Sequence, residues 1–414
     1  MTKKYLIIFL SLIYPLFSFG QNKNLDYFIN QSLQNDPRLT DIRNLVLSNK
    51  IDSELIRAAN KLQVSGSGNA YYAPVIGSYG YDGVITNGQQ LSALVAVNKQ
   101  INNKKNLNLQ FKSLQLQNDS LINSSAITKQ DIKKAIIIQY ITTYGDQLQL
   151  EFNDKLIHLL SKEESILKSL TQKNVYKQSD YLSFLVTLQQ QQLVKSQLLV
   201  QYKNDYASLN YLAGIIDTTT ETLSAPEIQL IPNYHATESP FFLGYKIDSQ
   251  RIENERMIAK IQYRPKVNLF GDAGYQSSLI LTPYKNFGYS FGINLTVPIY
   301  DGHQKQLQFS KLDIQQRTLQ KKQEFFDTQY RQQLQQLDQQ LNNIESLNTN
   351  ISKQIEYLET LIKVDGKLLE TGDIRITDFI LALNNYITAK NLVVQNQIAR
   401  YQVIQQINYW NMKL

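Results

Sequence analysis

Residues 330–362 read YRQQLQQLDQQLNNIESLNTNISKQIEYLETLI and decide the fold class. Apolar residues recur there every three or four positions, with one interruption at Asn348, which is the heptad spacing of a coiled-coil helix. The apolar positions are Tyr330, Leu334, Leu337, Leu341, Ile344, Ile351, Ile355, Leu358 and Ile362. No proline occurs in 299–414, so the pattern predicts one helix over about 303–368, roughly 100 Å long at 1.5 Å per residue. Such a helix is typical of coiled coils and helical tubes rather than of ordinary globular domains.

A second long run without helix breakers occupies the first half of the chain. Residues 75–225 contain no proline, and Gly145 is the only glycine between Asn103 and Ala213. Because proline and glycine are the residues that interrupt helices most strongly, we expect long helices in this half as well.

Segments of the opposite periodicity lie between the predicted helices. Residues 289–297 (YSFGINLTV) alternate apolar and polar side chains, as do residues 267–276 (VNLFGDAGYQ). A weaker strand is expected around the alternating residues Leu91, Ala93, Val95 and Val97, and a glycine-rich one at 64–72. Each has about the 9–11 residues of a tilted transmembrane strand, and aromatic residues gather near the strand ends, as in an interfacial girdle. The strands alone fit a soluble four-stranded sheet with one solvated face equally well.

The two halves match each other at a constant offset of 198 residues over about 120 positions. Residues 179–182 (SDYL) align with 377–380 (TDFI), and 209–212 (LNYL) align with 407–410 (INYW). We therefore predict two structural repeats, each made of a helix, a strand pair, a long helix, a tight turn and a helix. The first repeat is expected at 21–212, with strands at about 62–99 and a tip turn at about 172–179. The second repeat is expected at 241–414, with strands at about 266–298 and a tip turn at about 370–377. Residues 213–240 are the predicted linker between them.

Residues 1–20 (MTKKYLIIFLSLIYPLFSFG) have the features of a secretory signal peptide: two lysines, an apolar stretch, and small residues at Ser18 and Gly20. The alternative is an anchored N-terminal helix, for which the apolar stretch is short. After Gln21 no stretch approaches the roughly 18–20 apolar residues of a membrane-spanning helix. The mature protein is therefore expected to be exported, and to enter a membrane only through its strands.

Four strands are too few to close a barrel, and open strand edges cannot face lipid. If the strands cross a membrane, the protein must oligomerise. A dimer would supply eight strands, whose side chains nearly fill the interior, whereas a trimer would supply twelve and leave room for a pore. The trimer is the favoured interpretation.

The composition excludes several classes of function. The chain has no cysteine, so disulfides, thiolate metal sites and a lipidated N-terminal cysteine are ruled out. Its three histidines are scattered, and neither a metal site nor a cofactor is predicted. The net charge of +7 comes from single or paired basic residues without a dense patch, which argues against a nucleic-acid partner. Gly83 to Gln89 is the nearest run to a phosphate-binding loop, but glutamine replaces its lysine, and no enzyme activity is predicted.

Several motifs, in their order and spacing, resemble those of the TolC-like outer-membrane efflux family. They are LDYF at 25–28, NDPRL at 35–39, LNYLAG at 209–214, VPIYDG at 297–302 and TGDIRITDFILA at 371–382. The resemblance covers essentially the whole mature chain. It implies a mixed, mainly α fold: a homotrimer with four β-strands per protomer, a shared twelve-stranded barrel in outer-membrane lipid, and a long α-helical periplasmic barrel built from the two repeats.

The resemblance also implies a function and partners. The protein would be the exit duct of a tripartite efflux pump, passing small molecules passively from a periplasmic adaptor (membrane fusion) protein and an inner-membrane transporter to the outside. A second possibility is the outer-membrane channel of a type I protein secretion system. A third is a structural coiled-coil protein of the envelope without a pore.

The resemblance assigns roles to residues of the two helix–turn–helix tips. Asp378 would line the pore as a gate residue, with Asp180 at the equivalent place in the other half; each also suits the first turn of a helix, where its charge complements the dipole. The adaptor would dock at the tip residues Asn174, Val175, Thr371, Gly372 and Asp373.

Two positions depart from the family's reference tip. Ile374 replaces a basic residue and Leu381 replaces a second acid, with Arg375 one place along from the expected position. A latch of the reference kind is therefore not predicted.

Pro298, Asp301 and Gly302 are assigned a structural role, the turn from barrel to helix. Polar strand residues would line the barrel lumen and keep it wet; these are Asp272, Ser290, Asn294 and Thr296.

Overall fold

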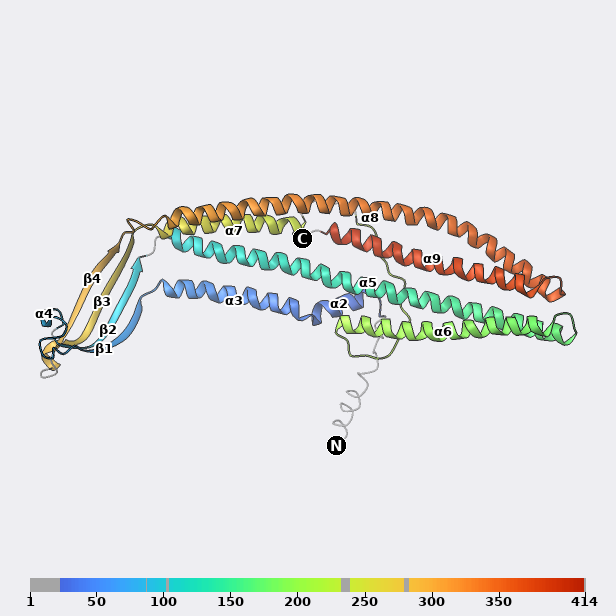
Figure 1. The fold of residues 1–414 in the computed structure, drawn as a ribbon, viewed down its shortest axis with the longest axis horizontal. Helices are drawn as coiled ribbons and strands as arrows, with labels where there is room; N and C mark the ends of the chain where they lie inside the picture. The colour runs from blue at the N-terminus through green and yellow to red at the C-terminus, as the bar shows by residue number, and fades with distance from the viewer. Residues whose placement is uncertain (1–22, 87, 102–103, 232–238, 279–282, 413–414) are drawn as a thin grey trace, which may run out of the picture. The chain divides into compact units, whose positions relative to one another are not determined.

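The computed structural model describes residues 23–86, 88–101, 104–231, 239–278 and 283–412 (Figure 1). The predicted signal peptide lies outside the described residues, as does the part of the predicted linker at 232–238. The elements, in chain order, are α2 (Leu25–Asn35), α3 (Pro37–Ala59), β1 (Gln63–Tyr72), α4 (Gly83–Thr86), β2 (Gln89–Ile101), α5 (Lys104–Gln172), α6 (Gln178–Ala213), α7 (Pro240–Gln262), β3 (Lys266–Ser277), the 3-10 helix η2 (Pro283–Asn286), β4 (Phe287–Thr296), α8 (Gln304–Thr371) and α9 (Ile376–Trp410).

The mainly helical fold class with four strands is confirmed. The strands form one antiparallel sheet in the order β1-β2-β3-β4, and they lie side by side in Figure 1. The central pair is β2 with β3, in which Ile101 lies opposite Val267 and Leu91 opposite Ser277. The sheet therefore joins strands from the two halves of the chain.

The long predicted helix is present as α8, which has 68 residues, and α5 is its counterpart with 69. The heptad seam of α8 faces the protein interior: Leu337 is 1% exposed, Ile351 3% and Ile362 8%. Gly145, within α5, permits a close approach to α9, because a Cβ there would overlap with Cδ1 of Ile398. Among the described residues, no helix combines the length and apolarity needed to cross a membrane.

The chain divides into two compact units, and each unit draws residues from both halves. The first comprises Met1–Thr40, Ser125–Pro240 and Phe326–Leu414; the second comprises Asp41–Ser124 and Phe241–Phe325. The second unit contains the sheet. The first contains both helix–turn–helix tips. The predicted repeats are instead consecutive halves of the chain, so the two compact units do not correspond to them. The repeats remain a prediction about the order of elements along the chain.

An aromatic core holds α2 against α5 and α6 in the first unit. The ring of Phe28, which is fully buried, packs edge-on against Tyr140 and Tyr206 at centroid distances of 6.0 and 6.1 Å. The Tyr140 hydroxyl donates to the backbone oxygen of Ser224 at 2.8 Å, which ties the segment after α6 to the same core.

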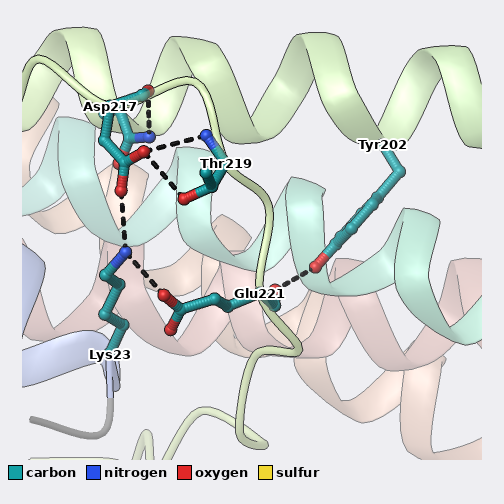
Figure 2. A network of polar contacts seen from close by, with 6 residues as sticks. Lys23, Tyr202, Asp217, Thr219 and Glu221 are labelled. Atoms are coloured by element: carbon teal, nitrogen blue, oxygen red, sulfur yellow. Dashed lines mark hydrogen bonds and ion pairs between the residues drawn. The ribbon is translucent and has the colours of Figure 1, made fainter. Parts of the chain in front are cut away.

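A polar network fastens the first described residue to that segment (Figure 2). The Lys23 ammonium lies 2.9 Å from Asp217 and 2.8 Å from Glu221. Asp217 also accepts hydrogen bonds from the backbone and hydroxyl of Thr219 at 2.8 and 2.7 Å, and Tyr202 donates to the backbone oxygen of Glu221 at 2.5 Å. The two carboxylates raise the pKa of Lys23, and the Thr219 and Lys23 donors lower the pKa of Asp217.

Candidate functional site

The two helical hairpins of the first unit end in turns of the same kind (Figure 1). After α5, the backbone N–H of Val175 donates to Leu170 at 3.0 Å, and Asn174 has a φ of 60°. After α8, the N–H of Asp373 donates to Leu368 at 2.9 Å, and Gly372 has a φ of 82°. Each helix thus stops at a left-handed residue whose neighbour satisfies a terminal carbonyl, which is the usual C-terminal capping arrangement.

The two turns are fastened to each other. The Tyr176 hydroxyl lies 3.0 Å from the carbonyl oxygen of Ile374 and 3.3 Å from that of Leu369, so a residue of the first turn bonds to both sides of the second. The Val175 side chain lies against Gly372, where a Cβ would come within 2.6 Å of Cγ1 of Val175. The predicted docking residues of the two tips therefore form one surface, on which Asn174, Val175, Thr371 and Asp373 are exposed.

An apolar cluster supports this surface from within the helices. The rings of Phe184 and Phe379 stack across α6 and α9 with centroids 6.3 Å apart and an interplanar angle of 26°. Both side chains are fully buried. The buried members of the cluster are Leu156, Leu160, Leu167, Phe184, Ile362, Leu369, Ile376, Phe379 and Leu383.

The predicted gate residue Asp378 has a partner within its own tip. Its Oδ2 lies 2.8 Å from Nε of Arg375 and its Oδ1 lies 3.1 Å from Nη2 of the same guanidinium. The Arg375 side chain is 82% exposed and that of Asp378 is 44% exposed. Asp180 occupies the first turn of α6 and makes no ion pair within the described part of the chain. Asp378 is thus compensated by Arg375, whereas Asp180 has no cation partner among the described residues.

The four-stranded sheet of the second unit has two chemically distinct faces. Register and alternation place apolar side chains on one face, and most of these are exposed: Phe291 is 83% exposed and Ile293 71%. Its larger side chains are Val64, Tyr72, Leu91, Val95, Val97, Ile101, Val267, Leu269, Tyr275, Phe287, Tyr289, Phe291, Ile293 and Leu295. The opposite face is rich in Ser, Asn and Gln and includes the predicted lumen residues Asp272, Ser290, Asn294 and Thr296.

The segment from β4 to α8 is organised by Asp301. Its two carboxylate oxygens accept from the backbone N–H groups of His303 at 3.0 Å and Lys305 at 2.9 Å, which caps the start of α8. Gly302 has a φ of 62°, a conformation that glycine adopts without strain. Pro298 lies at the start of this segment, two residues after β4 ends.

Comparison with solved structures places this architecture among known folds. The chain superposes on the transmembrane-channel protein CusC with a TM-score of 0.79, at 10% identity, over 94% of this chain and 92% of that one. For the outer-membrane protein VceC from Vibrio cholerae the TM-score is 0.75, at 12% identity, over 94% and 96%. For the Campylobacter jejuni CmeC outer membrane channel it is 0.73, at 10% identity, over 94% and 85%. The chain has the TolC-like fold.

No protein-family model matches the sequence, and comparison with curated proteins finds no significant relative. The TolC-like fold was therefore recognisable in the structure and in the short motifs, while overall sequence similarity is low.

Three residues of the TolC-like tip were not singled out from the sequence. No sequence pattern around Tyr176 indicated a role for it beyond its position in a predicted turn. Glu163 on α5 is only 5% exposed, and its Oε2 has no hydrogen-bond partner among the described residues. Asp365 on α8 is 8% exposed, and burial together with the charge of Asp378 raises its pKa. Asp365 could have been predicted from the sequence as a buried acid, because it occupies a position of the apolar heptad seam between Ile362 and Leu369.

Proposed function

We propose that the protein is the outer-membrane exit duct of a tripartite efflux pump. Three copies would join their sheets into a twelve-stranded barrel in the outer membrane, and the helices would extend into the periplasm. Small molecules would pass through it passively, delivered by a periplasmic adaptor and an inner-membrane transporter.

The observation that carries this proposal is the chemistry of the sheet. A soluble protein rarely leaves an apolar face of this size in water, whereas a transmembrane barrel needs one apolar and one polar face. Within the described residues β1 and β4 each pair with a single strand, so both outer edges keep unpaired backbone groups. Closure with further copies would satisfy these groups, which lipid cannot do.

The fold adds independent support. Two of the structures named above are described as outer-membrane proteins or channels, and the likeness extends over more than nine-tenths of this chain. No cluster of three or more His, Asp or Glu side chains that could hold a metal occurs among the described residues. The likeness to outer-membrane channel structures supports a transport function.

The joined tip surface is the proposed contact for the adaptor, and Asp378 is the proposed gate residue. Asn174, Val175, Thr371 and Asp373 are exposed on short turns whose positions are fixed by Tyr176 and by the buried Phe184–Phe379 pair. A rigid turn that presents backbone and small side chains suits a helical-hairpin partner. Three Asp378 carboxylates around one axis would favour cations at the periplasmic end.

Two measurements test the proposal. The purified full-length protein should come from outer-membrane fractions as a detergent-stable trimer, and it should give small, cation-selective conductance steps in a planar bilayer. Asp378→Ala should enlarge the steps or reduce their cation selectivity, whereas Asp373→Ala, a neighbouring exposed acid outside the proposed constriction, should leave both unchanged. A folded monomer in the soluble periplasm, or a folded trimer without conductance, would contradict the proposed duct.

A further inference from the structure

The strands of the sheet contain very few charged side chains. Of the residues in β1, β2, β3 and β4, only Lys99, Lys266 and Asp272 are charged. Lys99 is near the end of β2, where its ammonium donates to the backbone oxygen of Asn60, and Lys266 is the first residue of β3. Asp272 is in the middle of β3, so it is the one charge at the centre of the sheet within the described strands.

Asp272 lies on the polar face and has no cation beside it there. Its neighbours across the strands are Ala96 on β2 and Ser290 on β4. The Ser290 hydroxyl donates to Oδ2 of Asp272 at 2.6 Å, which holds the carboxylate in one orientation. Lys266 shares this face, but it is six residues away along β3, about 20 Å at 3.4 Å per residue. The negative charge at mid-sheet is therefore uncompensated.

An aromatic ring lies next to this carboxylate on the same face. Phe270 is two residues before Asp272 and directly opposite Gly292. A Cβ on Gly292 would come within 2.6 Å of Cζ of Phe270, so the glycine leaves the space in which the ring lies over β4. Phe270 is 40% exposed although the rest of the face is mostly amides and hydroxyls. A large apolar ring that stays accessible among polar side chains offers a stacking surface.

We propose that Phe270 and Asp272 form a binding site for organic cations on the inner wall of the barrel, and that the duct consequently favours amphiphilic cations over anions. This inference rests on the proposed function, because it takes the polar face as the inside of a trimeric barrel. Three Asp272 carboxylates would then form a ring at mid-barrel, where low-dielectric walls concentrate their potential. The Phe270 ring would contribute cation–π attraction and contact with apolar parts of the solute.

The site is distinct from the proposed gate. Asp272 is in the second compact unit, whereas Asp378 is in the first and is paired with Arg375. The two can be separated experimentally by making every comparison in an Asp378→Asn background, in which the proposed gate carboxylate is absent and the other tip carboxylates, including Asp180, are the same in every variant.

The test uses full-length trimer in a planar bilayer, with benzyltrimethylammonium as the probe and two readouts. The first is the K⁺/Cl⁻ permeability ratio from the reversal potential, and the second is block of the K⁺ current by the probe. Asp272→Asn should bring the permeability ratio close to one. It should also weaken block by at least about fivefold, because the attraction between one carboxylate and a cation about 4 Å away in water changes binding by about that factor. Phe270→Leu should weaken block by about two- to fivefold and leave the permeability ratio unchanged.

Two further variants control for indirect effects. Ser290→Ala removes the hydrogen bond and keeps the charge, so cation preference should persist. Adding Asn268→Asp to Asp272→Asn moves the carboxylate four residues along β3, to the other side of Phe270 on the same face, and should restore the preference. Conducting trimers whose permeability ratio and block are unaffected by Asp272→Asn would overturn this inference and leave the duct intact. Folded wild-type trimers that do not conduct would instead overturn the proposed function.

Discussion

Arg375 and Asp378 form a two-bond ion pair at the tip, with Nε–Oδ2 and Nη2–Oδ1 distances of 2.8 and 3.1 Å. The pair joins the residue before α9 to the first turn of that helix. If Asp378 lines the pore, Arg375 partly neutralises the charge that would otherwise attract cations. We therefore expect Arg375→Gln to increase cation selectivity in bilayer recordings, the opposite of Asp378→Asn.

Because both side chains of this pair are substantially exposed, stability should hardly respond. Exposed ion pairs contribute about 0–1 kcal/mol. The control is Lys177→Gln, which changes the matching residue before α6; there no ion pair to Asp180 is formed in the described structure. An identical permeability ratio in Arg375→Gln and wild type would remove Asp378 from the pore lining.

Tyr176→Phe should loosen the connection between the two tip turns. The change removes the hydroxyl that reaches the carbonyl oxygens of Leu369 and Ile374 while it keeps the ring. We expect the free energy of unfolding to fall by about 1 kcal/mol, and the channel to show larger or more frequent openings. Tyr357→Phe is the matched control, since Tyr357 is 74% exposed on α8. Equal effects of the two substitutions on conductance would argue against a fastening role for Tyr176.

Gly372→Ala should destabilise the tip through two effects that act together. The φ of 82° disfavours any residue with a Cβ, and that Cβ would lie 2.6 Å from Val175. We expect a loss of about 1–3 kcal/mol in denaturant unfolding. Asn174→Gly, at the left-handed position of the other turn, should instead change stability by only a few tenths of a kcal/mol. A neutral Gly372→Ala would show that the turn adopts another conformation.

Stability should depend on pH through Asp146. This carboxyl on α5 has a buried Oδ2 without a hydrogen-bond donor in the described structure, and burial together with Asp205 on α6 raises its pKa to about 7. The native state therefore keeps a proton that the unfolded chain releases near pH 4. The free energy of unfolding should consequently decrease as pH rises from about 4 to about 7, and then stay level with respect to this group.

Asp146→Asn should remove this part of the pH dependence. At pH 8 the variant should be more stable than the wild type by an amount on the order of 1 kcal/mol, and at pH 4 the two should be similar. Thermal unfolding at both pH values provides the measurement. The control Asp154→Asn changes an exposed carboxylate of the same helix that is paired with Lys195. A variant less stable than wild type at pH 8 would contradict the assignment.

Lys23→Met should release the segment after α6 from the helices. The substitution leaves the carboxylates of Asp217 and Glu221 without their shared cation, so residues near 215–224 should become accessible to proteinase K. Lys203→Met, an exposed lysine of α6 in the same unit, should leave the cleavage rate unchanged. Equal protection of both variants would show that the other contacts of the segment, among them those of Tyr140 and Tyr202, hold it without Lys23.

Periodic features of the sequence were enough to predict the helices and strands. The heptad spacing of residues 330–362 predicted α8 to within a few residues at each end, because a buried seam imposes the same periodicity on sequence and structure. Alternation predicted β4 and β3, where one face must be apolar. The glycine-rich segment at 64–72 was predicted as a strand and corresponds to β1, Gln63–Tyr72.

Contacts between segments far apart in the chain could not be predicted from the sequence. Nothing near Tyr176 indicates that its hydroxyl reaches α8, and nothing near Asp146 indicates a second carboxyl on α6, because such pairs depend on how helices pack. The pairing of Arg375 with Asp378 is different: the two residues are three positions apart across the start of α9, so the pair could have been inferred from local spacing.

The central strand pair has a consequence for how the protein folds. β2 forms its ladder with β3 although all of α5, α6 and α7 lies between them in the sequence. Such non-local pairing raises contact order, which slows folding, and until β3 is available the β1–β2 hairpin exposes an edge that can pair with the wrong chain. Correct folding therefore depends on keeping this hairpin shielded until β3 is available. Polar, glycine-rich β1 reduces the tendency of the unpaired hairpin to aggregate.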